Sequence, residues 1–315
     1  MKVSVCIPVY NVERYIGRCA RSLFVQTIGE DIEYIFVDDC SSDGSVETLM
    51  GILSEYPARR DQVKVIRFPC NRGVAAARTA AVAAATGDCV IHCDADDYVE
   101  PVMYEKMRET LLRERADVCC CGFAGGTSDG SCLNMKEGML CDGLTFIRKY
   151  APSEYFNSPV NKMYLKEVLN GLSYREDLRT GEDLVFNVQA MKKCRIVAQI
   201  PDSFYTYCRR ATSSITSRRD AQIGNSIIRA AEYMGDELPD GCFSDVRDRM
   251  YRNALLAAIR YGIRDKSSYQ ILMGKITGKV AKDARYGLAK CLLLRISQVS
   301  YPLACFLARM LTGSR

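Results

Sequence analysis

The first 123 residues alternate between short apolar runs and segments with helical periodicity. Such alternation is typical of a mostly parallel β-sheet flanked by helices, because parallel strands need a crossover between them. We therefore expect an α/β, Rossmann-like fold. The predicted strands are residues 3–9, 34–37, 63–68, 89–94 and 117–123. The predicted helices cover residues 12–26, 45–53 and 75–85 and a segment that begins at residue 101.

Acidic residues follow two of these predicted strands. Asp38 and Asp39 end the second strand, and Asp94, Asp96 and Asp97 follow the fourth. Because ligands bind at the carboxyl ends of strands in open α/β sheets, both groups are candidates for a ligand site. Three carboxylates within four positions repel one another unless a cation or hydrogen-bond donors share their charge. A turn that caps the next helix is the simpler alternative, since a short acidic triplet is a weak motif.

The chain becomes less regular after residue 125. Residues 127–140 are expected to form a hairpin or a loop, and helices are predicted at residues 144–150, 182–192 and 219–235. From about residue 243 onward only helical patterns remain. With 315 residues, the chain can hold one α/β domain and an extension.

Positive charge is concentrated at the end of the chain. Residues 266–315 contain nine lysines and arginines and one acidic residue, whereas the whole chain has a net charge of +5. Leu288, Leu292, Ile296, Val299 and Leu303 add an apolar stripe with helical spacing. This combination favours a helix that lies on an anionic membrane surface. A stripe packed on the rest of the protein or on a partner subunit is the alternative. No apolar run is long enough to predict a membrane-spanning helix.

The sixteen cysteines are poorly placed for a disulfide framework. Cys119, Cys120 and Cys121 are consecutive, and no two cysteines are three positions apart, which disfavours a zinc site. Reduced cysteines that act as small apolar residues fit a cytoplasmic protein. The first residues enter a strand directly, so we expect no signal peptide. His92 is the only histidine and more plausibly belongs to the core than to a metal site.

Four segments together resemble glycosyltransferase family 2. They are VCIPVYN at residues 5–11, VDDCSSDGS at 37–45, NRGVAAAR at 71–78 and DADD at 94–97. The resemblance implies a GT-A fold and an inverting enzyme with a nucleotide-diphospho-sugar donor. A divalent metal, Mn²⁺ or Mg²⁺, would then neutralise the departing diphosphate.

The resemblance also implies roles for individual residues. Pro8 and Asp39 are expected at the nucleoside pocket, Tyr10 is expected to contact the donor, and Arg72 is expected near the base. Asp94 is expected near the ribose or the donor sugar. Asp96 is expected to bind both the donor and the metal.

A further resemblance lies in GEDLVF at residues 181–186. It implies that Asp183 is the catalytic base and that Glu182 lies on the acceptor side. Displacement at an anomeric carbon needs a carboxylate to take the acceptor's proton, which fits this assignment. Acidic residues favoured by the dipole of a helix are the alternative. Lys162 and Arg209, which flank this region, are candidates for contacts with the donor phosphates.

The sequence thus predicts a GT-A catalytic domain over residues 1–216, with a nucleotide-sugar half at 1–125 and an acceptor half at 126–216. Residues 217–315 form a helical extension that is a candidate for membrane association. The predicted activity is sugar transfer from a UDP-sugar or similar donor to a hydroxyl of a glycan or lipid-linked saccharide, in cell-surface polysaccharide synthesis. The expected location is the cytoplasm or the inner membrane face, and we expect no nucleic-acid partner.

Two other functions remain open at this point. A sugar-phosphate nucleotidyltransferase would normally carry a glycine-rich loop after the first strand, but here no glycine occurs before Gly17. A non-catalytic subunit that binds nucleotide-sugars is disfavoured by the acidic pair Glu182 and Asp183.

Overall fold

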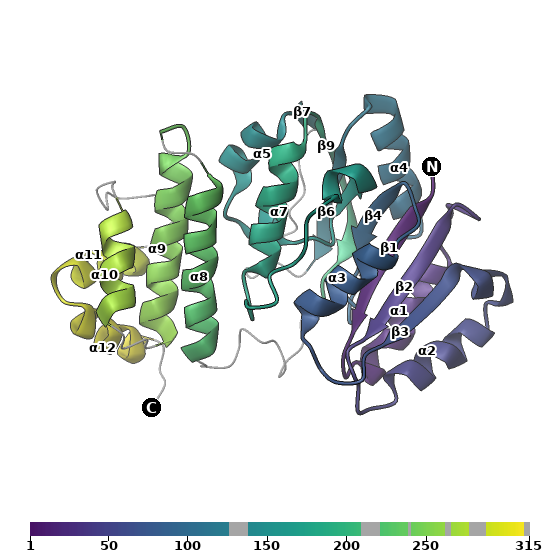
Figure 1. The fold of residues 1–315 in the computed structure, drawn as a ribbon, viewed down its shortest axis with the longest axis horizontal. Helices are drawn as coiled ribbons and strands as arrows, with labels where there is room; N and C mark the ends of the chain where they lie inside the picture. The colour runs from purple at the N-terminus through teal and green to yellow at the C-terminus, as the bar shows by residue number, and fades with distance from the viewer. Residues whose placement is uncertain (126–137, 209–220, 239–240, 262–265, 277–287, 312–315) are drawn as a thin grey trace. The chain divides into compact units, whose positions relative to one another are not determined.

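The computed structural model describes residues 1–125, 138–208, 221–238, 241–261, 266–276 and 288–311 (Figure 1). Contacts divide the chain into two compact units. The sheet unit contains Met1–Glu176 and Phe186–Arg210, and the helical unit contains Asp177–Val185 and Ala211–Arg315. Most of the hairpin or loop expected at residues 127–140 lies outside the described residues, as does Arg209.

Four parallel strands form the first half of the sheet. They are β1 (Val3–Val9), β2 (Ile32–Asp38), β3 (Val63–Arg67) and β4 (Cys89–His92). β1 pairs with both β2 and β4, and β3 pairs with β2. The connecting helices are α1 (Glu13–Phe24), α2 (Ser45–Ser54) and α3 (Val74–Ala84), with a 3₁₀ turn at Pro57–Gln62. The strand–helix alternation predicted from the sequence is confirmed, with boundaries that differ by a few residues.

Later strands add antiparallel pairings, so the whole sheet is mixed. These strands are β5 (Tyr98–Val99), β6 (Val118–Gly125), β7 (Met139–Cys141), β8 (Lys162–Leu165) and β9 (Val197–Thr206). In the described part of the chain the sheet order is β3-β2-β1-β4-β8-β6-β9-β5, with β7 beside β9. β8 pairs antiparallel with β4 and β6, whereas β6 and β9 are parallel.

Helices also accompany this second half of the sheet. They are α4 (Met103–Glu114), α5 (Gly143–Tyr150), α6 (Glu154–Asn157) and α7 (Glu182–Lys193), with a 3₁₀ turn at Lys166–Leu169. The division between the two units falls within α7, after Val185.

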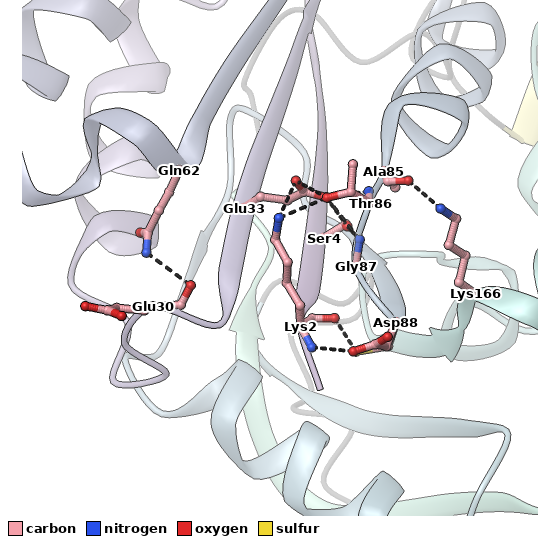
Figure 2. Close-up of polar contacts among 11 residues, drawn as sticks. Lys2, Ser4, Glu30, Glu33, Gln62, Ala85, Thr86, Gly87, Asp88 and Lys166 are labelled. Atoms are coloured by element: carbon pink, nitrogen blue, oxygen red, sulfur yellow. Dashed lines mark hydrogen bonds and ion pairs between the residues drawn. The ribbon is translucent and has the colours of Figure 1, made fainter.

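Glu33 connects strands at the amino-terminal edge of the parallel sheet (Figure 2). Its carboxylate accepts hydrogen bonds from the Lys2 ammonium at 2.9 Å, the Ser4 hydroxyl at 2.5 Å and the Thr86 backbone N–H at 2.6 Å. Burial alone would raise the pKa of Glu33, but these hydrogen bonds lower it to about 2. Glu33 therefore links β1, β2 and the loop before β4 at the edge opposite the predicted ligand site.

The helical unit is built around α9. Its helices are α8 (Ala221–Glu237), α9 (Ser244–Tyr261), α10 (Lys266–Lys275), α11 (Leu288–Val299) and α12 (Tyr301–Leu311). α8 packs on one side of α9, and α10 to α12 pack on the other (Figure 1). Tyr251, Leu255, Leu272 and Leu294 are buried in their shared apolar core. Across the described helices, none combines the length and hydrophobicity that crossing a membrane requires.

All fifteen cysteines within the described residues are free thiols, and most of those in the sheet are buried. Burial raises the pKa of the Cys120 and Cys121 thiols to about 12. Since the thiolate is the reactive form, these cysteines act as small apolar core residues.

Candidate active site

The ends of three parallel strands bring most of the predicted donor residues to one edge of the sheet. Val9 lies opposite Asp38, and Cys6 lies opposite His92, so β1, β2 and β4 end at the same edge. Pro8 lies near the end of β1, and Tyr10 follows it with 48% of its surface exposed. Asp39 follows β2 directly. This arrangement is the one expected from parallel strands.

Asp39 organises the loop that carries Arg72. Its carboxylate accepts hydrogen bonds from the backbone N–H groups of Arg72 at 2.6 Å and Gly73 at 2.8 Å, and Asp39 is almost fully buried. The Arg72 guanidinium lies 4.9 Å from the centre of the Phe68 ring and 3.3 Å from Glu176. Asp39 thus places Arg72 at the strand edge through the backbone, and the Arg72 side chain remains about half exposed.

Hydrogen bonds join the loop after β1 to the loop after β2. The Asn11 side-chain oxygen accepts the Ser42 backbone N–H at 2.9 Å, and the Asn11 N–H donates to the Ser41 hydroxyl at 3.1 Å. The Val12 N–H donates to the buried Ser45 hydroxyl at 2.8 Å. The two loops that border Tyr10 and Asp39 therefore hold each other in place.

Asp94 at the end of β4 pairs with a buried arginine. Nη2 of Arg78 donates to Oδ1 of Asp94 at 3.0 Å, and the Arg78 side chain is 5% exposed against 29% for Asp94. The Asp94 backbone N–H donates to the Tyr205 hydroxyl at 3.1 Å. Arg78 thereby offsets part of the negative charge that crowds this turn.

Asp97 has a different role from its neighbours, because it is fully buried. It accepts hydrogen bonds from the Tyr205 hydroxyl at 2.6 Å and from the Cys208 backbone N–H at 2.7 Å. Burial, together with the charges of Asp94 and Asp96, raises the pKa of Asp97 to about 8. Asp97 supports the turn from inside, while Asp94 and Asp96 remain partly exposed.

The chemistry of this turn fits a divalent metal that takes most of its ligands from substrate and water. Asp94 and Asp96 supply partly exposed carboxylates, the oxygen ligands that Mg²⁺ and Mn²⁺ prefer. Oδ1 of Asp94 accepts a hydrogen bond from Arg78, and the resemblance assigns the metal to Asp96. The described residues contain no group of three or more acidic, cysteine or histidine side chains arranged to hold a metal. Two carboxylates and a diphosphate suffice for Mg²⁺.

Two residues considered in the sequence belong to the protein interior. The Lys162 ammonium donates to the backbone carbonyls of Tyr155 at 2.8 Å and Ser158 at 2.6 Å, and its side chain is fully buried. These contacts hold its ammonium in the core of the sheet unit. His92 is buried next to Tyr174, and burial together with Arg78 lowers its pKa to about 3. The expectation that His92 is a core residue is confirmed.

Glu182 and Asp183 form the first turn of α7, as the sequence predicts. Glu182 is 6% exposed, and Asp183 is partly exposed. Both belong to the helical unit by their contacts. Their assignment to acceptor binding and to proton abstraction stays a prediction.

Local sequence patterns missed Tyr205 as a support of the acidic turn. Tyr205 lies 108 positions from Asp97, and in the sequence it looks like an ordinary strand residue. For Arg78, in an alanine-rich helix, the sequence allowed a contact with a diphosphate or base, a surface position or a pair with a carboxylate, and the structure shows the pair with Asp94. In neither case does the spacing in the sequence reveal the contact.

Comparisons with known proteins agree with this geometry. The profile of "Glycosyl transferase family 2" matches residues 4–172. The uncharacterized glycosyltransferase EpsJ of Bacillus subtilis is 32% identical over 68% of this chain and 62% of its own length. The poly(ribitol-phosphate) beta-glucosyltransferase of Bacillus spizizenii is 29% identical over 66% of this chain and 32% of its own length. The chain thus spans less than two thirds of either relative.

Solved structures share the fold. TarS of S. aureus, residues 1–349 in complex with UDP-GlcNAc, superimposes with a TM-score of 0.74 at 20% identity, covering 100% of this chain and 93% of that one. The mannosyltransferase PcManGT of Pyrobaculum calidifontis, in complex with GDP-Man and Mn²⁺, gives a TM-score of 0.57 at 16% identity over 98% of this chain and 87% of its own. The predicted GT-A-type α/β fold with a helical C-terminal region is confirmed.

Proposed function

The chain belongs to glycosyl transferase family 2, and we propose that it is an inverting, metal-dependent transferase that moves a sugar from a UDP-sugar to a hydroxyl group. The observation that supports this most is the shared strand edge, where the loops that follow β2, β3 and β4 carry Asp39, Arg72, Asp94 and Asp96. On one surface, this edge offers carboxylates for the nucleoside, the sugar and a metal, and an arginine for the base.

Each donor residue has a task in this proposal. Tyr10 and Pro8 border the nucleoside, and Asp39 accepts a hydrogen bond from the base while it holds the Arg72 loop. Arg72 contacts the base, which requires its guanidinium to exchange the Glu176 carboxylate for the donor. Breaking this ion pair costs little free energy, because both side chains are about half exposed. Asp94 binds the ribose or the sugar.

Asp183 acts as the base in this proposal. It takes the proton of the acceptor hydroxyl as that oxygen attacks the anomeric carbon, and Glu182 binds the acceptor beside it. Asp96 would hold Mn²⁺ or Mg²⁺, which supplies positive charge for the departing diphosphate. With the leaving group stabilised in this way, no general acid is needed.

The acceptor is proposed to be a glycan or a lipid-linked saccharide in cell-surface polysaccharide synthesis. This is supported by the names of the relatives, among which are poly(ribitol-phosphate) glycosyltransferases. UDP-linked sugars are the first donors to test because TarS was solved with UDP-GlcNAc.

We place the protein in the cytoplasm, at the inner face of an anionic membrane, with α11 and α12 as its contact. Leu292 and Val299 on α11 are 56% and 91% exposed, and Leu303 and Phe306 on α12 are 49% and 58% exposed. The exposed Lys290 and Arg295 lie on the same helix as the first two. Exposed apolar side chains beside basic ones complement an anionic lipid surface.

Vesicle sedimentation tests this location. The full chain should sediment with vesicles that contain phosphatidylglycerol and not with pure phosphatidylcholine. Phe306→Asp should reduce sedimentation, whereas Leu112→Asp, at an equally exposed position on α4, should not. Equal behaviour on both kinds of vesicle would refute the proposal. If the protein instead associates with itself, and Phe306→Asp abolishes this association, the exposed apolar residues of α11 and α12 contact a second copy of the chain.

A donor panel tests the activity itself. The unfolding temperature of the protein is recorded with Mn²⁺ and each of UDP-glucose, UDP-N-acetylglucosamine, GDP-mannose and nucleoside triphosphates. A bound ligand raises this temperature. Donors that raise the unfolding temperature are then incubated with poly(ribitol phosphate) and other polyols, and the released nucleotide is measured. A shift with triphosphates alone would favour a nucleotidyltransferase. Tight UDP binding without transfer to any acceptor would favour a non-catalytic subunit.

A further inference from the structure

The segment immediately before the acidic pair is bound to α8, a helix for which the sequence suggested no role in the reaction. Residues Asp177–Val185 belong to the helical unit by their contacts, although they lie within the region that resembles the catalytic domain. Three points along this segment contact α8, and each contact is of a different kind.

Asp177 provides the first point. Its Oδ2 accepts hydrogen bonds from Nη2 of Arg229 at 2.5 Å and from the Tyr233 hydroxyl at 2.8 Å. Nη1 of Arg229 also donates to the backbone carbonyl of Asp177 at 3.3 Å. One arginine thus holds both the side chain and the backbone of Asp177, which lies 52 positions earlier in the chain.

Arg179 and Gly181 provide the other two points. The Arg179 backbone N–H donates to the Ser226 hydroxyl at 2.7 Å, and Ser226 is buried. At Gly181, φ is +88°, and an added Cβ would lie 2.7 Å from the Cβ of Ala230. The backbone therefore approaches α8 more closely than any side chain at residue 181 would permit.

The four residues of α8 that make these contacts lie on one face of the helix. Ser226, Arg229, Ala230 and Tyr233 are spaced by three, four and seven positions from the first, which is the spacing of a single helical face. Ile228 and Ala231 of the same helix are buried in the apolar core shared with α9. The segment is thus attached to a helix that is itself fixed by core packing.

We propose that α8 positions the catalytic base, with Arg229, Tyr233 and Ser226 as positioning residues. They fix residues 177–181, and these in turn fix where α7 begins and how its first turn presents Asp183. This inference rests on the proposed function, in which Asp183 takes the proton of the acceptor. It makes the helical C-terminal region a part of the catalytic machinery.

The expected effect is larger on turnover than on stability. The Arg229 and Asp177 side chains are 50% and 32% exposed, and an ion pair this open to solvent adds little to stability. A misplacement of about 1 Å at a reacting group can nevertheless cost roughly 100-fold in rate.

The test compares variants of the full chain. Their kcat and KM are measured with the first donor and acceptor for which the donor panel shows transfer, and their binding affinity is measured with UDP. Arg229→Leu should lower kcat about 10- to 100-fold, with the donor KM and the UDP affinity within about twofold of the original protein. Tyr233→Phe should show a smaller loss in the same direction. Arg229→Lys, which keeps the positive charge and the ability to donate a hydrogen bond, should recover part of the lost kcat.

Asp245→Asn is the matched control. It removes another ion pair of the helical unit, between Arg249 and Asp245 at 2.8 Å within α9, without touching the segment before α7. Its kcat should equal that of the original protein. Unchanged kcat in Arg229→Leu would overturn the proposal. A parallel fall of kcat, UDP affinity and Tm would also overturn it, because that pattern indicates general loss of the fold.

Asp183→Asn separates this inference from the proposed function. If Asp183→Asn retains turnover, the base assignment fails and the positioning role of α8 fails with it. If Asp183→Asn is inactive while Arg229→Leu is fully active, the base assignment stands and only the role of α8 is refuted.

Discussion

The two acidic clusters of this protein are held in place by different means. The turn at Asp94–Asp97 is supported from within the sheet unit, by Arg78 on α3 and by Tyr205 on β9. The pair at Glu182 and Asp183 follows a segment that α8 of the helical unit holds. The turn at Asp94–Asp97 is formed where a strand ends, whereas the position of the acidic pair depends on a helix that comes later in the chain.

Similar acidic motifs therefore need not be equally independent of the rest of the fold. In the turn, negative charge is compensated at close range, so its geometry follows once the sheet forms. The acidic pair needs a correctly packed helical unit as well. Substitutions at the two clusters should therefore separate donor binding from turnover.

The largest expected effect is that of Asp183→Asn on turnover. Asparagine keeps the shape of the side chain but cannot accept the proton, so kcat should fall by at least about 100-fold. The UDP affinity should remain within about twofold, as measured by calorimetry. Full turnover in this variant would remove Asp183 from the mechanism.

Asp96→Ala should show the opposite pattern. Losing a charged contact of about 1.5–3 kcal/mol weakens donor binding by about 10- to 100-fold when Mn²⁺ is present. The measurement is a Mn²⁺ titration of UDP affinity in both proteins. A donor affinity that rises with Mn²⁺ equally in both would contradict the metal role of Asp96.

Gly181→Ala tests the close contact between the two parts of the helical unit. The added Cβ meets Ala230 and also strains a backbone with positive φ, which should cost about 1–3 kcal/mol in the free energy of unfolding and lower kcat. Gly241→Ala is the control, because φ there is +86° and nothing lies within 4 Å of the added atom. Denaturant unfolding of both variants separates the effect of the contact with Ala230 from the effect of backbone strain. If both variants lose the same free energy of unfolding, the close approach of Gly181 to α8 does not contribute to stability.

Glu33→Gln should have the smallest effect on activity, since Glu33 lies at the opposite edge of the sheet. At pH 7 it should lower the free energy of unfolding by about 1–2 kcal/mol, because hydrogen bonds to the charged carboxylate are weakened. The pKa of Glu33 is about 2 in the folded protein and 4.5 ordinarily, so its stabilising contribution is complete above about pH 4.5. It is lost as the pH falls towards 2, and the difference between the two proteins should shrink accordingly.

Denaturant unfolding between pH 3 and pH 7 checks this dependence. Glu30→Gln serves as the control, because Glu30 is an exposed neighbour on the same side of the sheet (Figure 2). A difference between Glu33→Gln and the original protein that stays constant with pH would argue against a charged Glu33. A large change in kcat would show that this edge influences the reaction.

Most of the sheet unit could be predicted because its signals are local. The apolar runs at β1, β2 and β4, and the polar residues that follow them, are visible in short windows of sequence. β8 and β9 were harder to predict because their partners are distant along the chain. Lys162 shows the limit most clearly, since it looks like a surface cation in the sequence and is fully buried in the structure.

The α/β fold class, the family and the positions of the acidic clusters could be read from the amino-acid sequence, because periodicity and motif spacing are properties of neighbouring residues. The tertiary structure was needed to show which carboxylate is buried, as Asp97 is, and which remain accessible, as Asp94 and Asp96 are. It also decided that α8 holds the segment before Asp183. Burial and long-range hydrogen bonds depend on which distant residues meet, and local patterns carry no information about that.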